Sequence, residues 1–396
     1  MFPKLRFKEF DGDLTESKLV ELTSWASGGT PAKDVPEYWG DDIPLISGAS
    51  MHTNQLYESD VKITKLGLQK GSKLALKDSI LILVRGSMLF NKIPMGITLG
   101  DVAFNQYVKC IRPKQQLAPL FLFQWLHAKE NTIQNKVTAT GIGAGKLDTA
   151  DLQNLKLYKP SLEEQTKIAT FLSAVDEKIS QLTQKHQLLR EYKQGMMQKL
   201  FSQQVRFKAD DKSEFGEWEE KELKDIAEIN PKSKKLPESF IYIDLESVEK
   251  GKLLLQKNIE LQDAPSRAQR LLAKGDVLFQ MVRPYQQNNY YFNLSGEYVA
   301  STGYAQIRTK LDSKFIYYAL HEKTFLDEVM NRCTGTSYPA INSSDLSSIE
   351  ILIPCLEEQT KIANFLSSID QKIEVVAQQI EQAKQWKKGL LQQMFI

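Results

Sequence analysis

The sequence is poor in the residues that build disulfides and metal sites. Its three cysteines are scattered and lack CxxC spacing, which predicts neither a disulfide framework nor a zinc site and favours a reduced, cytoplasmic compartment. The four histidines show neither HxxxH nor HExxH spacing, so we expect no bound metal. Two of them, His127 and His321, occupy equivalent helical positions, where a packing role is favoured.

Long apolar runs and a strong charge of one sign are also missing. No apolar run approaches the ~20 residues that a membrane span requires, so we expect no membrane association. The opening MFPKLRFKEF has too few apolar residues for a signal peptide. A net charge of +2 neither indicates nor excludes a polyanionic partner, because a near-neutral protein can still carry a basic face.

Catalytic motifs are missing as well. A methyltransferase would need a Gly-rich loop after a strand and an Asn/Asp-Pro-Pro-aromatic motif, and Asn230-Pro231-Lys232 lacks the second proline and the aromatic residue. The segment GIGAGK at residues 141–146 fails the GxxxxGK[ST] spacing of a phosphate loop. No Ser/His/Asp arrangement can be assembled, so we expect no catalytic residues in this chain.

What the sequence does contain is a long repeat. Residues 160–201 and 354–395 align at an offset of 194 without a gap, and 20 of the 42 positions are identical. Each copy follows a longer segment that is not a close copy. This order predicts a first module at 1–159, a helical spacer at 160–201, a second module at 202–353 and a second spacer at 354–396.

Both copies carry apolar residues in alternating steps of four and three, which predicts a coiled coil rather than an isolated surface helix. The predicted seam comprises Ile168, Leu172, Val175, Ile179, Leu182 and Leu189 in the first copy, and Ile362, Leu366, Ile369, Ile373, Val376 and Ile380 in the second. Lys193 and Lys387 fall at matching seam positions, where a lysine either fixes the register or extends its ammonium group to solvent. Ser161 is a predicted N-cap, with Glu164 completing a capping box.

The two modules are predicted to be diverged copies of one fold. The segment DSILILVR at 78–85 parallels DVLFQMVR at 276–283, and short β-type runs are predicted at 43–46, 80–84, 240–243 and 277–282. Helices are expected near 120–129 and 314–331. The predicted fold class is therefore α+β, with a small bent sheet in each module.

The chain ends match in an informative way. Residues 205–208 (VRFK) follow the first repeat, and residues 5–8 (LRFK) stand near the N-terminus, while the second repeat ends at Phe395. The end of the second helix is therefore expected to continue, without a covalent bond, into the N-terminal segment. This circular plan predicts an antiparallel pair of helices and a pseudo-two-fold arrangement of two similar modules.

The whole layout resembles the specificity subunit of type I restriction–modification systems. The resemblance is carried by P-x-LEEQTKIA-x-FLS followed by D-x-KI at 160–179 and 354–373, and by K-x-G at 193–195 and 387–389. The Val-Arg strand motifs, Phe7…Gly12 and the FGEW of 215–218 also fit. The helical motif is specific, whereas the modules match in layout only.

The resemblance implies a protein without catalytic activity or cofactor of its own. Each module would be a target-recognition domain for one half of a split, asymmetric site on double-stranded DNA. The spacers would set the half-site distance and dock two modification subunits, which carry S-adenosylmethionine and methylate adenine, and a restriction subunit would translocate and cleave DNA. The alternative from another class is a coiled-coil scaffold that spaces two protein-binding modules without DNA.

Side chains for DNA recognition should be Arg, Lys, amide, hydroxyl or aromatic groups on loops. The polar run at 283–291 is the main prediction for base contacts, although a plain hairpin turn fits it equally well. The candidates in the first module are Thr30, Lys33, Arg85, Ser87 and Lys146. Those in the second are Lys232, Lys234, Arg267, Arg270, Arg283, Tyr285, Gln286, Gln287, Asn288, Ser337 and Tyr338.

Overall fold

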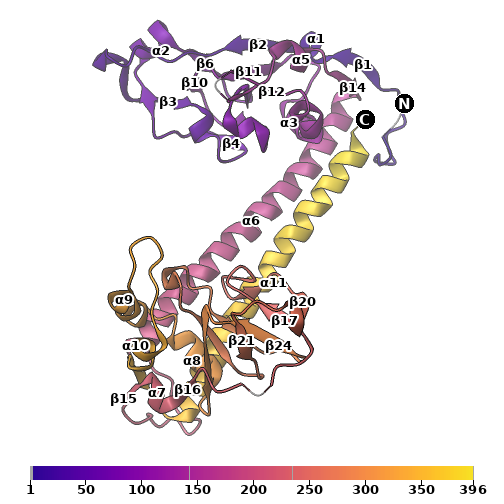
Figure 1. The fold of residues 1–396 in the computed structure, drawn as a ribbon. Helices are drawn as coiled ribbons and strands as arrows, with labels where there is room; N and C mark the ends of the chain where they lie inside the picture. The colour runs from indigo at the N-terminus through magenta and orange to yellow at the C-terminus, as the bar shows by residue number, and fades with distance from the viewer. Residues whose placement is uncertain (1–2, 142, 234, 396) are drawn as a thin grey trace. The chain divides into compact units, whose positions relative to one another are not determined.

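The computed structural model describes residues 3–141, 143–233 and 235–395. Its two longest elements are the helices α6 (Leu162–Phe201) and α11 (Leu356–Met394), which coincide with the predicted spacers (Figure 1). The chain divides into two compact units: unit 1 is Met1–Thr183 with Gln378–Ile396, and unit 2 is Gln184–Ala377. Each unit therefore contains one module and a part of both long helices. No helix within the described residues is long and apolar enough to cross a membrane.

The module of unit 1 is built on two larger sheets and two smaller ones. A five-stranded sheet has the order β2-β11-β7-β9-β4, and a four-stranded sheet has the order β5-β3-β10-β6. The first comprises β2 (Thr23–Ser27), β11 (Val108–Pro113), β7 (Ile80–Leu83), β9 (Met95–Thr98) and β4 (Gln55–Leu56). The second comprises β5 (Lys62–Ile63), β3 (Trp39–Ile46), β10 (Val102–Phe104) and β6 (Lys73–Ala75). All four aliphatic side chains of β7 are buried, which places this strand in the core.

The module of unit 2 also has two larger sheets, with four strands each, beside two two-stranded sheets. One comprises β16 (Ala227–Ile229), β25 (Tyr304–Thr309), β22 (Val277–Gln280) and β23 (Tyr290–Tyr291), in that order. The other comprises β20 (Lys257–Glu260), β17 (Ser239–Ile243), β24 (Tyr298–Ser301) and β21 (Ala268–Leu271). Together with the long helices, these sheets confirm the predicted α+β class.

The predicted strands are confirmed within a few residues, as β3, β7, β17 and β22. The first predicted helix is α3 (Pro119–Ala128), which buries Trp125 in the unit 1 core. The second prediction, one helix over 314–331, was wrong, because the segment forms α8 (Ser313–Ala319) and α9 (Lys323–Arg332). Between them, the Glu322 carboxylate accepts the backbone N–H groups of Thr324 and Phe325 and so caps the start of α9.

The sequence parallel between 78–85 and 276–283 was wrong by one residue. Thr98 N–H donates to Ser79 O, and Phe292 N–H donates to Asp276 O, so Ser79 corresponds to Asp276. The left-handed residue before the strand is Asp78 (φ 65°) in unit 1 and Gly275 (φ 95°) in unit 2. Asp78 and Asp276 are therefore not equivalent, and Arg85 corresponds to Val282.

The two long helices are antiparallel within unit 1 (Figure 1). The early part of α6, including Ile168 and Leu172, shares one core with Leu390 and Met394 at the end of α11. The Lys387 ammonium donates to the Asp176 carboxylate at 2.5 Å, and the second oxygen of Asp176 accepts the Gln124 amide at 2.8 Å. One carboxylate thus joins both long helices to α3 of the module.

Unit 2 repeats this arrangement with the helices exchanged. Leu200, late in α6, shares a core with Ile362 and Leu366, which lie early in α11. The Lys193 ammonium donates to Asp370 at 2.6 Å, and the Tyr318 hydroxyl of α8 donates to the other oxygen at 2.7 Å. The seam lysines therefore bind carboxylates on the opposite helix rather than extending into solvent, which supports their role in register.

The predicted seam residues lie mostly in the interior. Nine of the twelve are buried: Ile168, Leu172, Val175, Leu182, Ile362, Leu366, Ile369, Val376 and Ile380. Ile179, Leu189 and Ile373 are half-buried. The apolar periodicity therefore marks the helix faces that pack against the rest of each unit.

A buried ion pair fixes the segment before each module to a long helix. The Arg6 guanidinium donates to both oxygens of Glu164 at 2.7 Å and to Gly12 O. Ser161 Oγ accepts the N–H of Glu164, so the N-cap prediction is confirmed, but the side chain of Glu164 is bound to Arg6 rather than turned back to the cap.

Unit 2 has the same pair in Arg206 and Glu358, with distances of 3.1 and 2.7 Å. The chain-end expectation fits these contacts, since Leu5 N–H donates to Gln393 O as Val205 N–H donates to Lys199 O. The N-terminal segment therefore follows the end of α11 as residues 202–208 follow the end of α6.

Candidate nucleic-acid interface

Two groups of arginines differ in their partners. Arg6, Arg206, Arg308 and Arg332 each bind a carboxylate in an ion pair. The predicted DNA contacts Arg85, Arg267, Arg270 and Arg283 have no carboxylate partner among the described residues. An arginine without an internal counter-ion remains available to an external anion.

The candidate residues of unit 1 are linked by contacts between neighbouring side chains. Thr30 donates its hydroxyl to the side-chain oxygen of Gln106 at 2.7 Å, and Thr30 and Lys33 line a cavity of about 570 Å³. The neighbouring Tyr107 carries the Arg85 guanidinium over its ring, 5.7 Å from the centroid. These contacts bring together residues from the loop at 28–33, the turn at 105–107 and the segment that follows β7.

A small sheet connects Lys146 to Arg85. β8 (Arg85–Gly86) pairs with β13 (Gly145–Lys146), which pairs with β12 (Thr138–Ala139), and Lys146 is the direct partner of Arg85. Lys146 forms an exposed ion pair with Asp148 at 2.9 Å. The GIGAGK segment is the hairpin between β12 and β13, apart from Ile142, which lies outside the described residues. Ser87 is exposed at the start of the short helix Ser87–Phe90.

Backbone packing explains the two glycines that precede Thr30. A Cβ on Gly28 would lie 2.0 Å from Phe104 O, and one on Gly29 would lie 2.3 Å from Gly71 O. Side chains are therefore excluded at both positions. The close approach holds Thr30 beside the 105–107 turn, and Gly29 N–H donates to Phe104 O at 3.0 Å.

In unit 2, the polar run after β22 is held in place by Gln280. This buried amide donates to Val282 O and to the Gln286 side chain, and accepts the N–H of Asn288. The side chain of Asn288 accepts Lys250 N–H, and Gln287 donates to His321 O. The amides of Gln286, Gln287 and Asn288 therefore all take part in internal hydrogen bonds that shape the loop.

Other side chains of this loop are exposed and can contact an external partner. Tyr285 is 51% exposed, and Arg283, at φ 55°, lies with its guanidinium 4.3 Å from the ring centroid of Tyr338. Tyr338 is itself 62% exposed, next to the exposed Ser337. The structure thus brings Arg283, Tyr285, Ser337 and Tyr338 to one place, because Arg283 N–H also donates to Pro339 O.

A second group in unit 2 surrounds β21. Ser233 bonds Gln269 O and Leu271 N–H, which holds the loop containing the exposed Lys232 against the strand that carries Arg270. Arg267 is exposed just before this strand. The Nε of Arg270 is buried without a hydrogen-bond partner, and this burial lowers the pKa of Arg270. Lys234 lies outside the described residues.

His321 contacts the 283–289 loop. Its Nδ1 lies 2.7 Å from Tyr317 O and its Nε2 lies 3.4 Å from the Asn289 amide. Desolvation lowers the pKa of His321 to about 4, and the nearby Lys193 charge acts in the same direction. The packing role favoured for this histidine fits these contacts.

We expect acid to weaken unit 2 through His321. Because its folded pKa lies below the ordinary value of 6.5, its contribution is complete above pH 6.5 and is lost as the pH falls towards 4. The wild type should lose roughly 2–3 kcal/mol more unfolding free energy across this window than His321→Gln. Urea unfolding at several pH values measures the difference, with exposed His52→Gln as the control. Equal pH slopes in wild type and His321→Gln would contradict the assignment.

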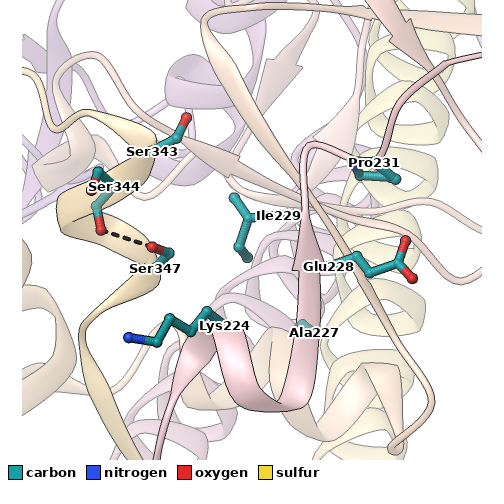
Figure 2. Close-up of a pocket in the computed structure, with 8 residues that line it drawn as sticks. All are labelled: Lys224, Ala227, Glu228, Ile229, Pro231, Ser343, Ser344 and Ser347. Atoms are coloured by element: carbon teal, nitrogen blue, oxygen red, sulfur yellow. Dashed lines mark hydrogen bonds between the residues drawn. The ribbon is translucent and has the colours of Figure 1, made fainter.

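A separate surface pocket of about 540 Å³ lies beside α7 (Leu223–Ile226) and α10 (Ser343–Ser347). Figure 2 shows Lys224, Glu228 and three serines around it, with Ser347 donating to Ser344 O. The Asn230 side chain next to it is bound to Ser343 and to Gln306 N–H, so it acts as a structural bridge. No trio of His, Cys, Asp or Glu within the described residues is placed to hold a metal.

Three contributors to the site were missed by sequence reasoning. Gln106 and Tyr107 lie in a short turn without a motif, and Gln280 is part of a strand that otherwise looks like plain core. The one available signal was the amide within the apolar run LFQMV, where a buried polar group must find partners.

Comparison with known proteins identifies the family of this chain. A family profile described as the type I restriction modification DNA specificity domain matches residues 12–190 and 216–385. The MjaVIII specificity subunit of Methanocaldococcus jannaschii, a type I restriction enzyme subunit, is 27% identical over 97% of this chain and 94% of its own. The putative MjaX specificity subunit of the same organism is 28% identical over 98% and 94%.

The fold has relatives among solved structures. The S subunit of a type I restriction–modification system from M. genitalium superposes with a TM-score of 0.63 at 17% identity, covering 100% of this chain and 99% of that chain. None of these matches supports the alternative of a scaffold without DNA. Since the family profile covers most of both modules and helices, the chain belongs to the family of type I restriction–modification DNA specificity subunits.

Proposed function

We propose that unit 1 and unit 2 each read one half of a split, asymmetric site on double-stranded DNA. The observation that carries this proposal is a feature that both units have in different residues. After the central strand of each module, an arginine without a carboxylate partner among the described residues lies over an exposed tyrosine: Arg85 over Tyr107 and Arg283 over Tyr338. Because the residues around the two arginines differ, the two half-sites should differ in sequence.

The chemistry of these clusters suits a DNA groove. Arginine binds guanine O6 and N7 or a phosphate through its planar fork, and amides and hydroxyls bind base edges. Each cluster lies on loops fixed by backbone hydrogen bonds to the module core, such as Val84 N–H to Tyr107 O and Arg283 N–H to Pro339 O. A fixed loop loses little conformational entropy when it binds.

We also propose that this chain positions partner enzymes instead of catalysing a reaction itself. Two modification subunits would dock on the α6 and α11 helices, carry S-adenosylmethionine and methylate adenine, and restriction subunits would complete the cytoplasmic complex. The duplicated helix sequence supports two equivalent docking sites, since residues 160–179 and 354–373 share the same motif.

The assembled complex should be tested against a library of randomised duplexes at several salt concentrations. We expect two short motifs separated by a fixed gap, and an affinity that falls with salt because phosphates are neutralised. A single contiguous motif, or the absence of any sequence preference, would refute the proposal.

Replacing Arg283 by alanine distinguishes three roles of this side chain. If it contacts a base, discrimination at one position of one half-site should fall by ~1–3 kcal/mol. A uniform loss across sequences would indicate a phosphate contact, and a large drop in melting temperature would indicate a structural role. Arg283→Lys is the matched control, because it keeps the charge and removes the bidentate fork.

A further inference from the structure

Gln106 lies at the tip of the tight turn between β10 and β11. Val108 N–H donates to Asn105 O at 3.2 Å, and Tyr107 N–H donates to the Asn105 side chain at 3.0 Å. Asn105 is thus committed to shaping the turn, whereas the side chain of Gln106 is exposed. The turn presents this one amide outward from the module.

The Gln106 side-chain amide is held in place by one hydrogen bond and can form further ones. Its Oε1 accepts the Thr30 hydroxyl at 2.7 Å, and a carbonyl oxygen has a second lone pair. Its Nε2 has no hydrogen-bond partner in the part of the chain that the structure describes. One acceptor position and one donor group therefore remain, in the fixed geometry of a carboxamide.

The surroundings favour a base over a phosphate at this place. The cavity beside Gln106 is lined by the apolar side chains of Trp39, Leu45 and Val61, with Lys33 as the charged residue of its lining. The cations Lys33 and Arg85 flank the turn and have no carboxylate partner among the described residues. A phosphate would be held at the cations, with the base edge against Gln106.

We propose that Gln106 is a specificity-determining residue that reads an adenine in the half-site of unit 1. This inference rests on the proposed function. Adenine presents an N6 donor and an N7 acceptor side by side in the major groove, which match Oε1 and Nε2 of a glutamine. Thr30 is a positioning residue that holds the amide for this contact.

The described residues of unit 2 show no counterpart of the Thr30–Gln106 contact. Val84 N–H donates to Tyr107 O, as Met281 N–H donates to Gly303 O, so Gly303 stands where Tyr107 stands. Thr302 precedes Gly303 as Gln106 precedes Tyr107, so the turn of unit 2 presents a hydroxyl where unit 1 presents the amide. A change at Gln106 should accordingly alter one half-site and leave the other intact.

The test uses the full complex with Gln106→Glu and maps its preferred duplexes in a randomised library. A carboxylate keeps the shape but replaces the donor by an acceptor, so it should reject adenine N7 and favour the N4 donor of cytosine. We expect adenine preference at one position of one half-site to fall about tenfold to a hundredfold. Thr30→Val should weaken the same position less, without changing which base is preferred.

Exposed Gln115→Glu is the matched control, because it adds the same charge elsewhere in unit 1. An unchanged motif in Gln106→Glu, or a loss spread equally over all positions, would overturn the inference. The motif of the wild-type complex is determined separately, and a contiguous motif there would refute the proposed function. The base preferred by the Gln106→Glu complex would still decide the role of Gln106.

Discussion

Replacing Arg206 by methionine should lower the unfolding free energy of unit 2 by about 2–4 kcal/mol. The substitution leaves the Glu358 carboxylate, which is fully buried, without its cation. Among the described residues, only the Trp218 indole N–H, at 3.1 Å, would still donate to it. A buried charge that loses its partner retains its desolvation cost, which is why the expected loss is large.

Urea unfolding of the full chain, with hydrogen exchange followed in residues 205–218 and 356–366, measures this effect. Lys221→Met is the control, since the ion pair of Lys221 with Glu219 is exposed and should not shift the transition measurably. The double variant Arg206→Met with Glu358→Met should recover part of the loss, because no charge is then left buried. Equal stability of Arg206→Met and the control would refute a structural role for the pair.

Exchanging residues 202–353 for the same module of another family member should replace one half-site completely and leave the other unchanged. The structural reason is that unit 1 and unit 2 have separate cores and separate clusters of available cations. The exchange keeps both long helices, and with them the seam residues and the lysine–aspartate pairs.

Mapping of methylated adenines in DNA from cells that contain the hybrid complex reports the outcome. The reciprocal exchange of residues 1–159 is the control and should alter the other half-site. A change in both halves after a single exchange would show that the units do not read DNA independently.

The long-range order of the protein was predictable from the repeat, whereas the site was predictable only in part. Identical residues at a fixed offset reveal both helices, because a 3.5-residue periodicity depends on the sequence of one segment alone. The modules place Thr30, Arg85 and Lys146 together through hydrogen bonds and strand pairing between segments far apart in the chain. No local pattern encodes these contacts.

Two errors have specific physical causes. The helix at 314–331 is interrupted because Glu322 caps a new helix, a choice that competes with continuing the first one. The one-residue shift between the strands at 80–83 and 277–280 arose because glycine in one unit occupies the left-handed position that aspartate occupies in the other. Chemically different residues can adopt the same backbone angle, so an alignment based on identical residues placed the two strands one residue out of register.

The Asp176–Lys387 and Asp370–Lys193 contacts have a consequence for how such a protein can change in length. Aspartate and lysine are separated by the same number of residues in α6 and in α11. An insertion between them in one helix alone would displace one of the two ammonium groups from its carboxylate. A longer variant that keeps both contacts needs equal insertions in both helices, so the two copies of the repeat must lengthen in concert.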